Sequence, residues 1–288
     1  MTSSQLNHLS SMLENLWANF DELFDSLDDD GWQTPHGSEW IFADVPYHLA
    51  YFDRYIARYL EQGPGLPKEE HLSLVSLNDM NRWNAAEFAR RLVNQTPAQS
   101  VAEMCTARDE IRRLLAGLDD ADLERPAWMF LLSLRGWRTV RGVLGVCLMH
   151  TWNEFVQFRL HMGHETPKSD PVLLRFCLAA FLAYLQSFIN VQLAAETHMN
   201  VVYDFPGVGV WTVQIGDGQG KVTEGHRSDA KIVFTQNPTT MMKTFNGMHD
   251  PAAAMQTGEI RVQGFEHLPT FAALYPPPGL DQVIPALP

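Results

Sequence analysis

The period of the hydrophobic residues changes after about residue 196 of this 288-residue chain, and that change constrains the fold more than any other feature. Before about residue 162, apolar side chains recur at three-and-four spacing, which is typical of amphipathic helices. After residue 196, β-branched and aromatic residues form short runs separated by PGVG, GDGQG and HRSD, which is typical of hairpin strands. The length allows two domains, each with its own core.

The first half of the chain is predicted to form an antiparallel bundle of four long helices. Asp44 followed by Pro46 is a typical helix start, and Gly163 is a typical helix end. Sites in such bundles are built from side chains on facing helices. The helices are expected at about residues 4–28, 44–62, 80–118 with an interruption at 95–97, and 139–162, with a loop or short irregular helix at 64–80.

The second half is predicted to be an α+β domain, with a five-stranded, mostly antiparallel sheet covered by helices. The polar segment HETPKSDP, residues 164–171, is the expected linker, which gives domains at about 1–165 and 172–288. The expected elements are a helix at 172–196, an antiparallel meander made of VVYDF, GVWTVQI, GKVTEG and AKIVFT, helical turns at 238–247 and 251–257, a strand in EIRVQG, and a helix at 267–274.

Charge and cysteine usage exclude several classes of partner. The formal charge of −13, from 21 basic and 34 acidic residues, disfavours nucleic acids and anionic membrane surfaces. Cys105, Cys147 and Cys177 are widely spaced and form no CxxC pair, so neither a disulfide scaffold nor a cysteine zinc site is expected. A reducing cytoplasm suits this pattern. The first residues lack the basic and apolar regions of a signal peptide.

One uncharged segment, residues 176–195, is long enough to span a bilayer. It contains Gln186, Asn190 and Gln192, and no comparable second segment exists. Membrane spans are predominantly apolar, so this segment is expected to be a mostly buried helix, and a spanning helix is the alternative.

A metal site is the hypothesis that the polar residues of the fourth helix favour. His150 and Glu154 stand four residues apart and therefore project from one side of a helix. A catalytic zinc site commonly has three protein ligands and one open position, and His48 on the second helix is the candidate third ligand. The alternative for each residue taken singly is an ordinary buried histidine or a solvated glutamate.

The stretches EWIFADVPYHLAYFDRYI and GWRTVRGVLGVCLMHTWNEFVQFRLHMG resemble the DinB superfamily of four-helix metalloproteins, which includes thiol-dependent S-transferases and mycothiol-dependent maleylpyruvate isomerases. Trp40, His48, His150 and Glu154 match the places of the family signature. NRWNAAEFARRL and GLDDADLERP are also similar to the family. The resemblance implies a divalent metal held by His48, His150 and Glu154, and a low-molecular-weight thiol as cosubstrate.

The order of the two ligands on the fourth helix departs from the family pattern. Many members have His at both places, or Glu followed by His, whereas this chain has His150 and then Glu154. Two histidines and one carboxylate suit zinc and also non-haem Fe(II). Zinc is the expected metal, with iron or nickel as alternatives.

The stretch from VVYDF to GEIRVQG resembles a sterol carrier protein type 2 domain, whose fold encloses an apolar cavity. The resemblance places several residues near such a cavity, and ordinary core packing is the alternative. These residues are Met241, Met242, Phe245, Met248, Met255 and Phe271.

Three other groups of residues are weaker candidates for a functional site, and each has an ordinary structural explanation. GVGVW and GDGQG lack the strand-to-helix context of phosphate loops, so hairpin turns are expected. His161 and His164 lie near a helix end, where a histidine favours the macrodipole. Cys105 and Cys147 have no neighbour that would activate a thiolate, so core positions are expected.

The expected function is therefore that of a metal-dependent enzyme, a thiol-dependent transferase or isomerase acting on a small or apolar substrate. No catalytic residue beyond the metal ligands is predicted. The alternative is a protein that binds lipid or another hydrophobic ligand and has a structural or vestigial metal site. A closed shell, with His161 or Cys147 as a fourth ligand, would favour that alternative. An Fe(II) oxygen-using enzyme is a third possibility. The oligomeric state is not predicted.

Overall fold

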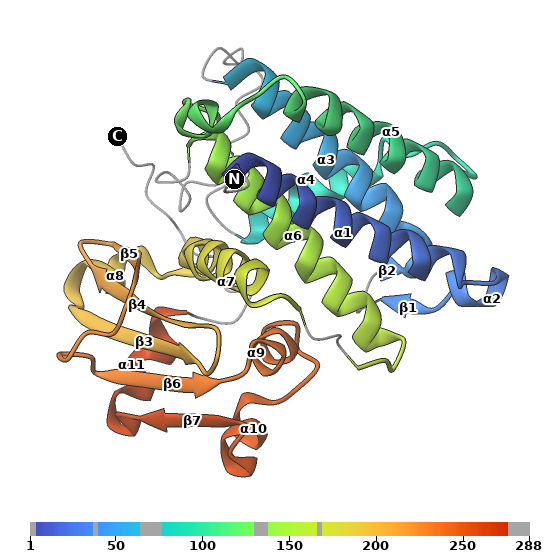
Figure 1. The fold of residues 1–288 in the computed structure, drawn as a ribbon. Coiled ribbons are helices and arrows are strands. Elements are labelled where there is room, and N and C mark those ends of the chain that lie inside the picture. Colours follow the sequence, from blue (N-terminus) through green and yellow to red (C-terminus); the bar gives the residue numbers. More distant parts are fainter. Residues whose placement is uncertain (1–3, 37–39, 64–76, 130–137, 166–168, 276–288) are drawn as a thin grey trace. The chain divides into compact units, whose positions relative to one another are not determined.

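The computed structural model describes residues 4–36, 40–63, 77–129, 138–165 and 169–275 (Figure 1). The chain divides into two compact units, and the second contains the chain from Ser169 onward. Each unit is described by itself below. The expected class, a helical first unit followed by a mixed sheet with helices, is confirmed.

Long helices dominate the first unit. Helix α3 packs against α5 and α6, and α1 packs against α6, and Figure 1 shows these four helices side by side. The elements of this unit are α1 (Gln5–Asp25), α2 (Asp29–Trp32), β1 (Pro35–His36), β2 (Trp40–Ile41), η1 (Phe42–Asp44), α3 (Val45–Gln62), α4 (Leu77–Phe88), α5 (Pro97–Leu115), η4 (Asp120–Glu124) and α6 (Val140–His161).

Local sequence signals set the ends of these helices. The hydroxyl of Thr96 accepts from the Gln99 amide and the Gln99 side chain accepts from the Thr96 amide, which begins α5 with a capping box. Thr139 caps α6 by accepting from the Gly142 amide. The carboxylate of Asp120 accepts from the amides of Gln5 and Leu6, so η4 satisfies donors at the start of α1.

The core of the first unit lies between the apolar faces of the long helices. Phenylalanine rings dominate it, and Phe20 contacts Phe155 with ring centroids 5.6 Å apart. One cluster of this core consists of the buried residues Phe20, Leu23, Phe24, Phe42, Val45, Leu49, Ala50, Met104, Phe155 and Phe158.

Two short strands precede α3 and are separated from it by η1. β1 and β2 pair antiparallel, with Pro35 opposite Ile41 and His36 opposite Trp40. The Ile41 amide donates to the carboxylate of Asp44, the last residue of η1, over 2.9 Å. This hairpin contacts α6 and holds His36 and Trp40 close to the first turns of α3.

A five-stranded sheet forms the second unit, in the order β5-β4-β3-β6-β7. β3 and β6 run parallel, and the other neighbours are antiparallel. The strands are β3 (Met199–Phe205), β4 (Gly209–Gly216), β5 (Gln219–Glu224), β6 (Ile232–Gln236) and β7 (Ile260–Gln263).

The sequence prediction of a simple antiparallel meander is wrong at its fourth strand. β3, β4 and β5 do form a meander, and the tight turn after β4 uses Asp217 and Gly218, both with positive φ. β6 then crosses to the free edge of β3 and pairs parallel to it, with Val201 opposite Ile232. Alternation within strands gives their number and faces, but it contains no information about their order in the sheet.

The apolar stretch predicted as one helix at 172–196 is divided into three pieces, α7 (Pro171–Leu185), η6 (Gln186–Phe188) and α8 (Val191–Glu196). The side chain of Asn190 caps α8 by accepting from the Leu193 amide. Gln186 donates to the Leu182 carbonyl and accepts from the Tyr275 hydroxyl. Pro171–Phe188 is long and apolar enough to cross a membrane, but half of it is buried, so this is weak evidence for a span.

Three further α-helices and one 3-10 helix complete the described part of the second unit: α9 (Pro238–Phe245), α10 (Pro251–Thr257), η7 (Phe265–His267) and α11 (Leu268–Leu274). Phe271 of α11 packs against Phe234 of β6, with ring centroids 5.3 Å apart. Met241 and Met242 are buried, whereas Phe245 is partly exposed. The placement of these residues beside an apolar cavity remains a prediction.

Candidate metal centre

His48 lies in the first turns of α3, facing α6. Pro46 stands at the start of that helix, and the ring of His48 is buried, 5% exposed. Trp40 of β2 covers it, with ring centroids 4.8 Å apart. Trp40 and His48, which both match the family signature, are thus in direct side-chain contact.

His150 and Glu154 stand one turn apart on α6, as their spacing predicts. Glu154 is buried and His150 is partly buried. Phe52 of α3 stacks on the His150 ring, with centroids 3.7 Å apart and an angle of 11° between the planes. The two residues therefore face α3 rather than solvent.

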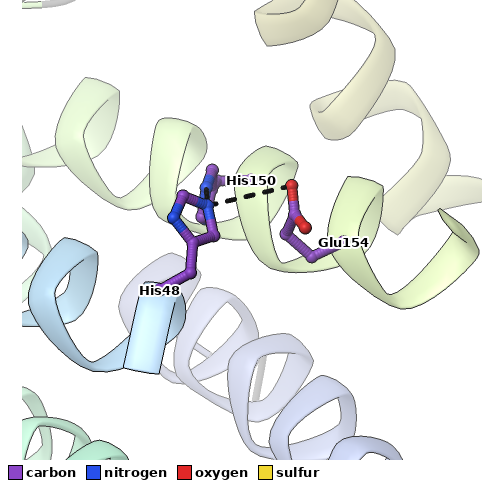
Figure 2. A group of neighbouring side chains, drawn as sticks. All are labelled: His48, His150 and Glu154. Atoms are coloured by element: carbon purple, nitrogen blue, oxygen red, sulfur yellow. Dashed lines mark hydrogen bonds and ion pairs between the residues drawn. The ribbon is translucent and has the colours of Figure 1, made fainter. Parts of the chain in front are cut away.

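These three side chains converge on one point (Figure 2). Nε2 of His48 lies 2.9 Å from Nε2 of His150 and 4.0 Å from Oε1 of Glu154. One nitrogen or oxygen atom from each residue lies within 4.8 Å of the other two. Two imidazole nitrogens and one carboxylate oxygen at such distances are a donor set that could hold a divalent cation.

The electrostatics of the group also suit a cation. Burial lowers the pKa of both His48 and His150 to about 3, so both rings are neutral at pH 7 with a lone pair for a metal. Burial favours the protonated form of Glu154, but the hydrogen bond with His36, followed by favourable electrostatic interactions with the His48 and His36 rings, outweighs it and lowers the pKa. A buried carboxylate beside two neutral rings is stabilised by a bound positive charge.

The structure adds a histidine to this region that sequence analysis did not single out. Nε2 of His36 lies 3.8 Å from Oε2 of Glu154, and Nδ1 of His36 lies 3.0 Å from Nδ1 of His161. His36 is buried. Its position in the turn-rich TPHG stretch gave no helical spacing that could have indicated this contact.

Neither Cys147 nor His161, the residues that could have closed the shell as a fourth ligand, belongs to the group. The Sγ atom of Cys147 lies 3.9 Å from Oδ1 of Asp53, and His161 contacts His36 instead. His164 is exposed. Among the described residues, the group that could hold a metal ion consists of His48, His150 and Glu154. All three cysteines are free thiols, as the sequence predicted, and burial raises the pKa of the Cys147 thiol.

Comparison with protein families identifies the class of protein to which this helical unit, with its His-His-Glu group, belongs. The model of the DinB superfamily matches residues 12–155, and the chain belongs to this superfamily. The model of the SCP-2 sterol transfer family matches residues 191–267. Both resemblances found in the sequence are thereby confirmed.

The solved structures that match this chain have low sequence identity to it. The mycothiol-dependent maleylpyruvate isomerase is 13% identical with a TM-score of 0.47, and the match covers 85% of this chain and 90% of that one. The ubiquinone synthesis protein UbiJ-SCP2 is 16% identical with a TM-score of 0.28, covering 36% of this chain and 94% of that one. The sec-alkylsulfatase Pisa1 from Pseudomonas sp. is 13% identical with a TM-score of 0.32, covering 81% and 32%. No curated protein sequence matches the chain.

Proposed function

We propose that this chain is a metal-dependent enzyme of the DinB superfamily, a thiol-dependent transferase or isomerase that acts on a small or apolar substrate. His48, His150 and Glu154 hold the metal, and zinc is the preferred ion, with iron or nickel as alternatives. The observation that carries the proposal is the convergence of two neutral imidazoles and one buried carboxylate from α3 and α6 within 4.8 Å.

The donor count supports an enzyme rather than a structural metal site. Structural zinc sites are normally closed by four protein ligands, whereas catalytic sites keep a position for water or substrate. Cys147 and His161 are the two nearby donors on α6, and each contacts another partner. Three protein ligands leave room for a small molecule to bind directly.

The residues around the group perform the remaining tasks. When bound, a divalent cation lowers the pKa of a coordinated thiol and thereby supplies a thiolate nucleophile at neutral pH. Trp40 and Phe52 cover His48 and His150, which limits the access of water to the ligands. The neutral imidazoles keep their lone pairs for the cation, and ionised Glu154 balances part of its charge.

The second unit supports a role for an apolar ligand. We propose domains at 1–165 and 172–288, with the second domain binding a hydrophobic substrate or carrier ligand. The support is the match of residues 191–267 to a sterol transfer family. The free thiols and the charge of −13 fit a cytoplasmic protein with small-molecule partners rather than nucleic acid.

Cobalt substitution tests the thiol-dependent function. Metal-free protein is loaded with Co²⁺ and titrated with glutathione, cysteine or mycothiol, while the sulfur-to-cobalt charge-transfer absorption is recorded. A band that grows with one of these thiols in the wild type, and is missing in His150→Ala, is the expected result. A cobalt-loaded protein that gives no band with any thiol would count against the function. A band before thiol is added would point to Cys147 as a fourth ligand.

The alternative function is a lipid-binding protein with a structural or vestigial metal site. It is favoured by the sterol transfer match alone. Organic extraction of the purified protein followed by mass spectrometry distinguishes the two. A stoichiometric lipid in the wild type, together with no effect of thiols on the cobalt spectrum, would favour the alternative.

A further inference from the structure

The hydroxyl of Tyr51 connects the candidate metal ligand His48 to a side chain on a third helix. Tyr51 follows His48 by one turn of α3, and its side chain is fully buried. Its oxygen forms a short hydrogen bond with Nδ1 of His48. The same hydroxyl donates to Oδ1 of Asn84 on α4 over 2.9 Å. Neither Tyr51 nor Asn84 is a proposed metal ligand.

The direction of these bonds determines which nitrogen of His48 carries the proton. A tyrosine hydroxyl has one hydrogen, and here it is directed to the carbonyl oxygen of Asn84. The Tyr51 oxygen can therefore only accept from His48, which requires hydrogen on Nδ1. A neutral imidazole with hydrogen on Nδ1 has its lone pair on Nε2. That Nε2 is the atom that faces His150 and Glu154.

We infer that Tyr51 and Asn84 are positioning residues that hold His48 in the tautomer required for metal binding. The Asn84 carbonyl accepts from the Tyr51 hydroxyl, and the Tyr51 oxygen accepts from the Nδ1–H group of His48. The Nε2 lone pair of the same ring is then directed at the metal position. This inference rests on the proposed function, because it assigns Nε2 of His48 to a metal.

The Nδ1 atoms of His150 and His48 differ in their hydrogen bonding. Its Nδ1 atom is buried and has no hydrogen-bond partner, whereas Nδ1 of His48 has one. Stacking on Phe52 restrains the plane of the His150 ring, but stacking does not select a tautomer. Tyr51 therefore determines which nitrogen of His48 carries the proton, and His150 has no equivalent partner at Nδ1 among the described residues. Loss of such a partner typically weakens metal binding 10–100-fold.

Tyr51→Phe removes the acceptor for the Nδ1 hydrogen while it preserves the aromatic ring. Tyr47→Phe is the matched control, because Tyr47 lies on the same helix, is buried and donates to the Glu87 carbonyl over 3.0 Å. Asn84→Ala and Asn84→Asp test the direction of the chain. Alanine leaves the Tyr51 hydroxyl free to donate to His48, whereas an ionised aspartate only accepts and keeps the Tyr51 hydrogen directed away from it.

Two measurements are made on each variant. Nitrogen-15 NMR of histidine-labelled, metal-free protein reports the tautomer of His48, with His48→Gln used to assign its signals. Competition with a chromophoric chelator gives the affinity for Zn²⁺. We expect hydrogen on Nδ1 in the wild type, Tyr47→Phe and Asn84→Asp. In Tyr51→Phe and Asn84→Ala we expect a shift towards hydrogen on Nε2 and a 10–100-fold loss of Zn²⁺ affinity.

The two readouts separate this inference from the metal proposal. If the wild type binds no Zn²⁺, the proposed function fails, and the tautomer of His48 is still measured in the metal-free protein. If the wild type binds Zn²⁺ but Tyr51→Phe keeps both the tautomer and the affinity, the inference is overturned and the metal site stands. Equal losses of affinity in Tyr51→Phe and Tyr47→Phe, with no tautomer change, would also overturn it.

Discussion

His48 and His150 are buried as neutral side chains, and this burial sets the properties of the candidate metal centre. His48 and His150 have a pKa of about 3 in the folded chain, compared with about 6.5 for an unperturbed histidine. Desolvation is the principal cause for both rings. Both rings are therefore neutral in the folded protein without metal, and each resists protonation in acid.

This burial predicts how the stability of the metal-free protein depends on pH. Above about pH 6.5 these histidines are neutral in both folded and unfolded chains, so they add no pH dependence. Between about pH 6.5 and 3, the unfolded chain takes up protons that the folded chain does not. Each histidine is thus expected to lower the free energy of unfolding by about 1.4 kcal/mol per pH unit as the pH falls.

Urea unfolding of the metal-free protein at pH 7.0, 6.0 and 5.0 measures this dependence. His48→Gln is expected to lose the share of the slope contributed by one histidine, because glutamine does not titrate. An identical slope in His48→Gln and the wild type would show that His48 is not held neutral by burial.

The contact of His36 with Glu154 yields a second prediction at this scale. His36 lies 3.8 Å from Oε2, the carboxylate oxygen that does not face His48. His36→Ala is expected to weaken Zn²⁺ binding about tenfold, because it removes a partner that orients the ligand rather than the ligand itself. Glu154→Ala should have a larger effect.

Chelator competition on the two variants gives this comparison. His164→Ala, which changes an exposed histidine, is the control and should match the wild type. An affinity in His36→Ala equal to that of the wild type would exclude an orienting role for His36.

The residues of the candidate site differ in how far they could be predicted. His150 and Glu154 were indicated by helical spacing, and His48 by the signature that it shares with Trp40. His36 could not be found, because its contact with Glu154 depends on how the β1-β2 hairpin meets α6. Tyr51 could be placed one turn from His48, but its bond to Asn84 requires the packing of α4.

At the scale of elements, the long helices were predictable and the breaks within apolar segments were not. The start of α6 at Val140 follows from the Thr139 cap, and α3 begins directly after Asp44. The division between α7 and α8 depends on the side-chain bonds of Gln186, one of them to the distant Tyr275. The polar residue Asn190, which caps α8, is visible in the sequence, whereas the bond of Gln186 to a residue 89 positions away is not.

A buried ion pair between helices leads to a prediction about stability. Nη1 of Arg108 on α5 lies 3.0 Å from Asp21 of α1, and its Nε lies 3.7 Å from Asp53 of α3. Burial raises the pKa of Asp53 to about 6, although Arg108 opposes this shift. Arg108→Met leaves the Asp53 carboxylate buried without its partner, and at pH 7.5 it should cost about 3–5 kcal/mol of unfolding free energy.

Arg113→Met is the matched control, because Arg113 is exposed and pairs with Glu110 on the same helix. Its expected cost is about 0–1 kcal/mol. Urea unfolding at pH 7.5 measures both variants. Equal costs for the two substitutions would mean that the Arg108 cluster contributes no more than a surface pair.

At the scale of the whole molecule, the change of hydrophobic period correctly separated a helical unit from a sheet unit. It could not give the strand order, because the parallel pairing of β3 with β6 is a long-range contact. Nor could composition decide between a metalloenzyme and a carrier, because the chain contains regions that match both families. The functional choice therefore depends on the site in the first unit.

The two compact units predict a selective response to metal. In differential scanning calorimetry of the metal-free protein, two transitions are expected, because each unit has its own core. Zn²⁺ at about 100 times its dissociation constant should stabilise the helical unit by about 2.7 kcal/mol and leave the other transition in place. A metal-induced shift of the sheet unit's transition alone would contradict the placement of the site.

Elemental analysis of untagged protein tests whether His48, His150 and Glu154 bind a metal ion. Protein purified without a metal-binding tag is measured beside His48→Ala, Glu154→Ala and the control His164→Ala, with circular dichroism to confirm folding. We expect one equivalent of a divalent metal in the wild type and the control, and loss of that metal from His48→Ala and Glu154→Ala. Folded wild-type protein without stoichiometric metal, or unchanged metal in His48→Ala, would contradict this expectation.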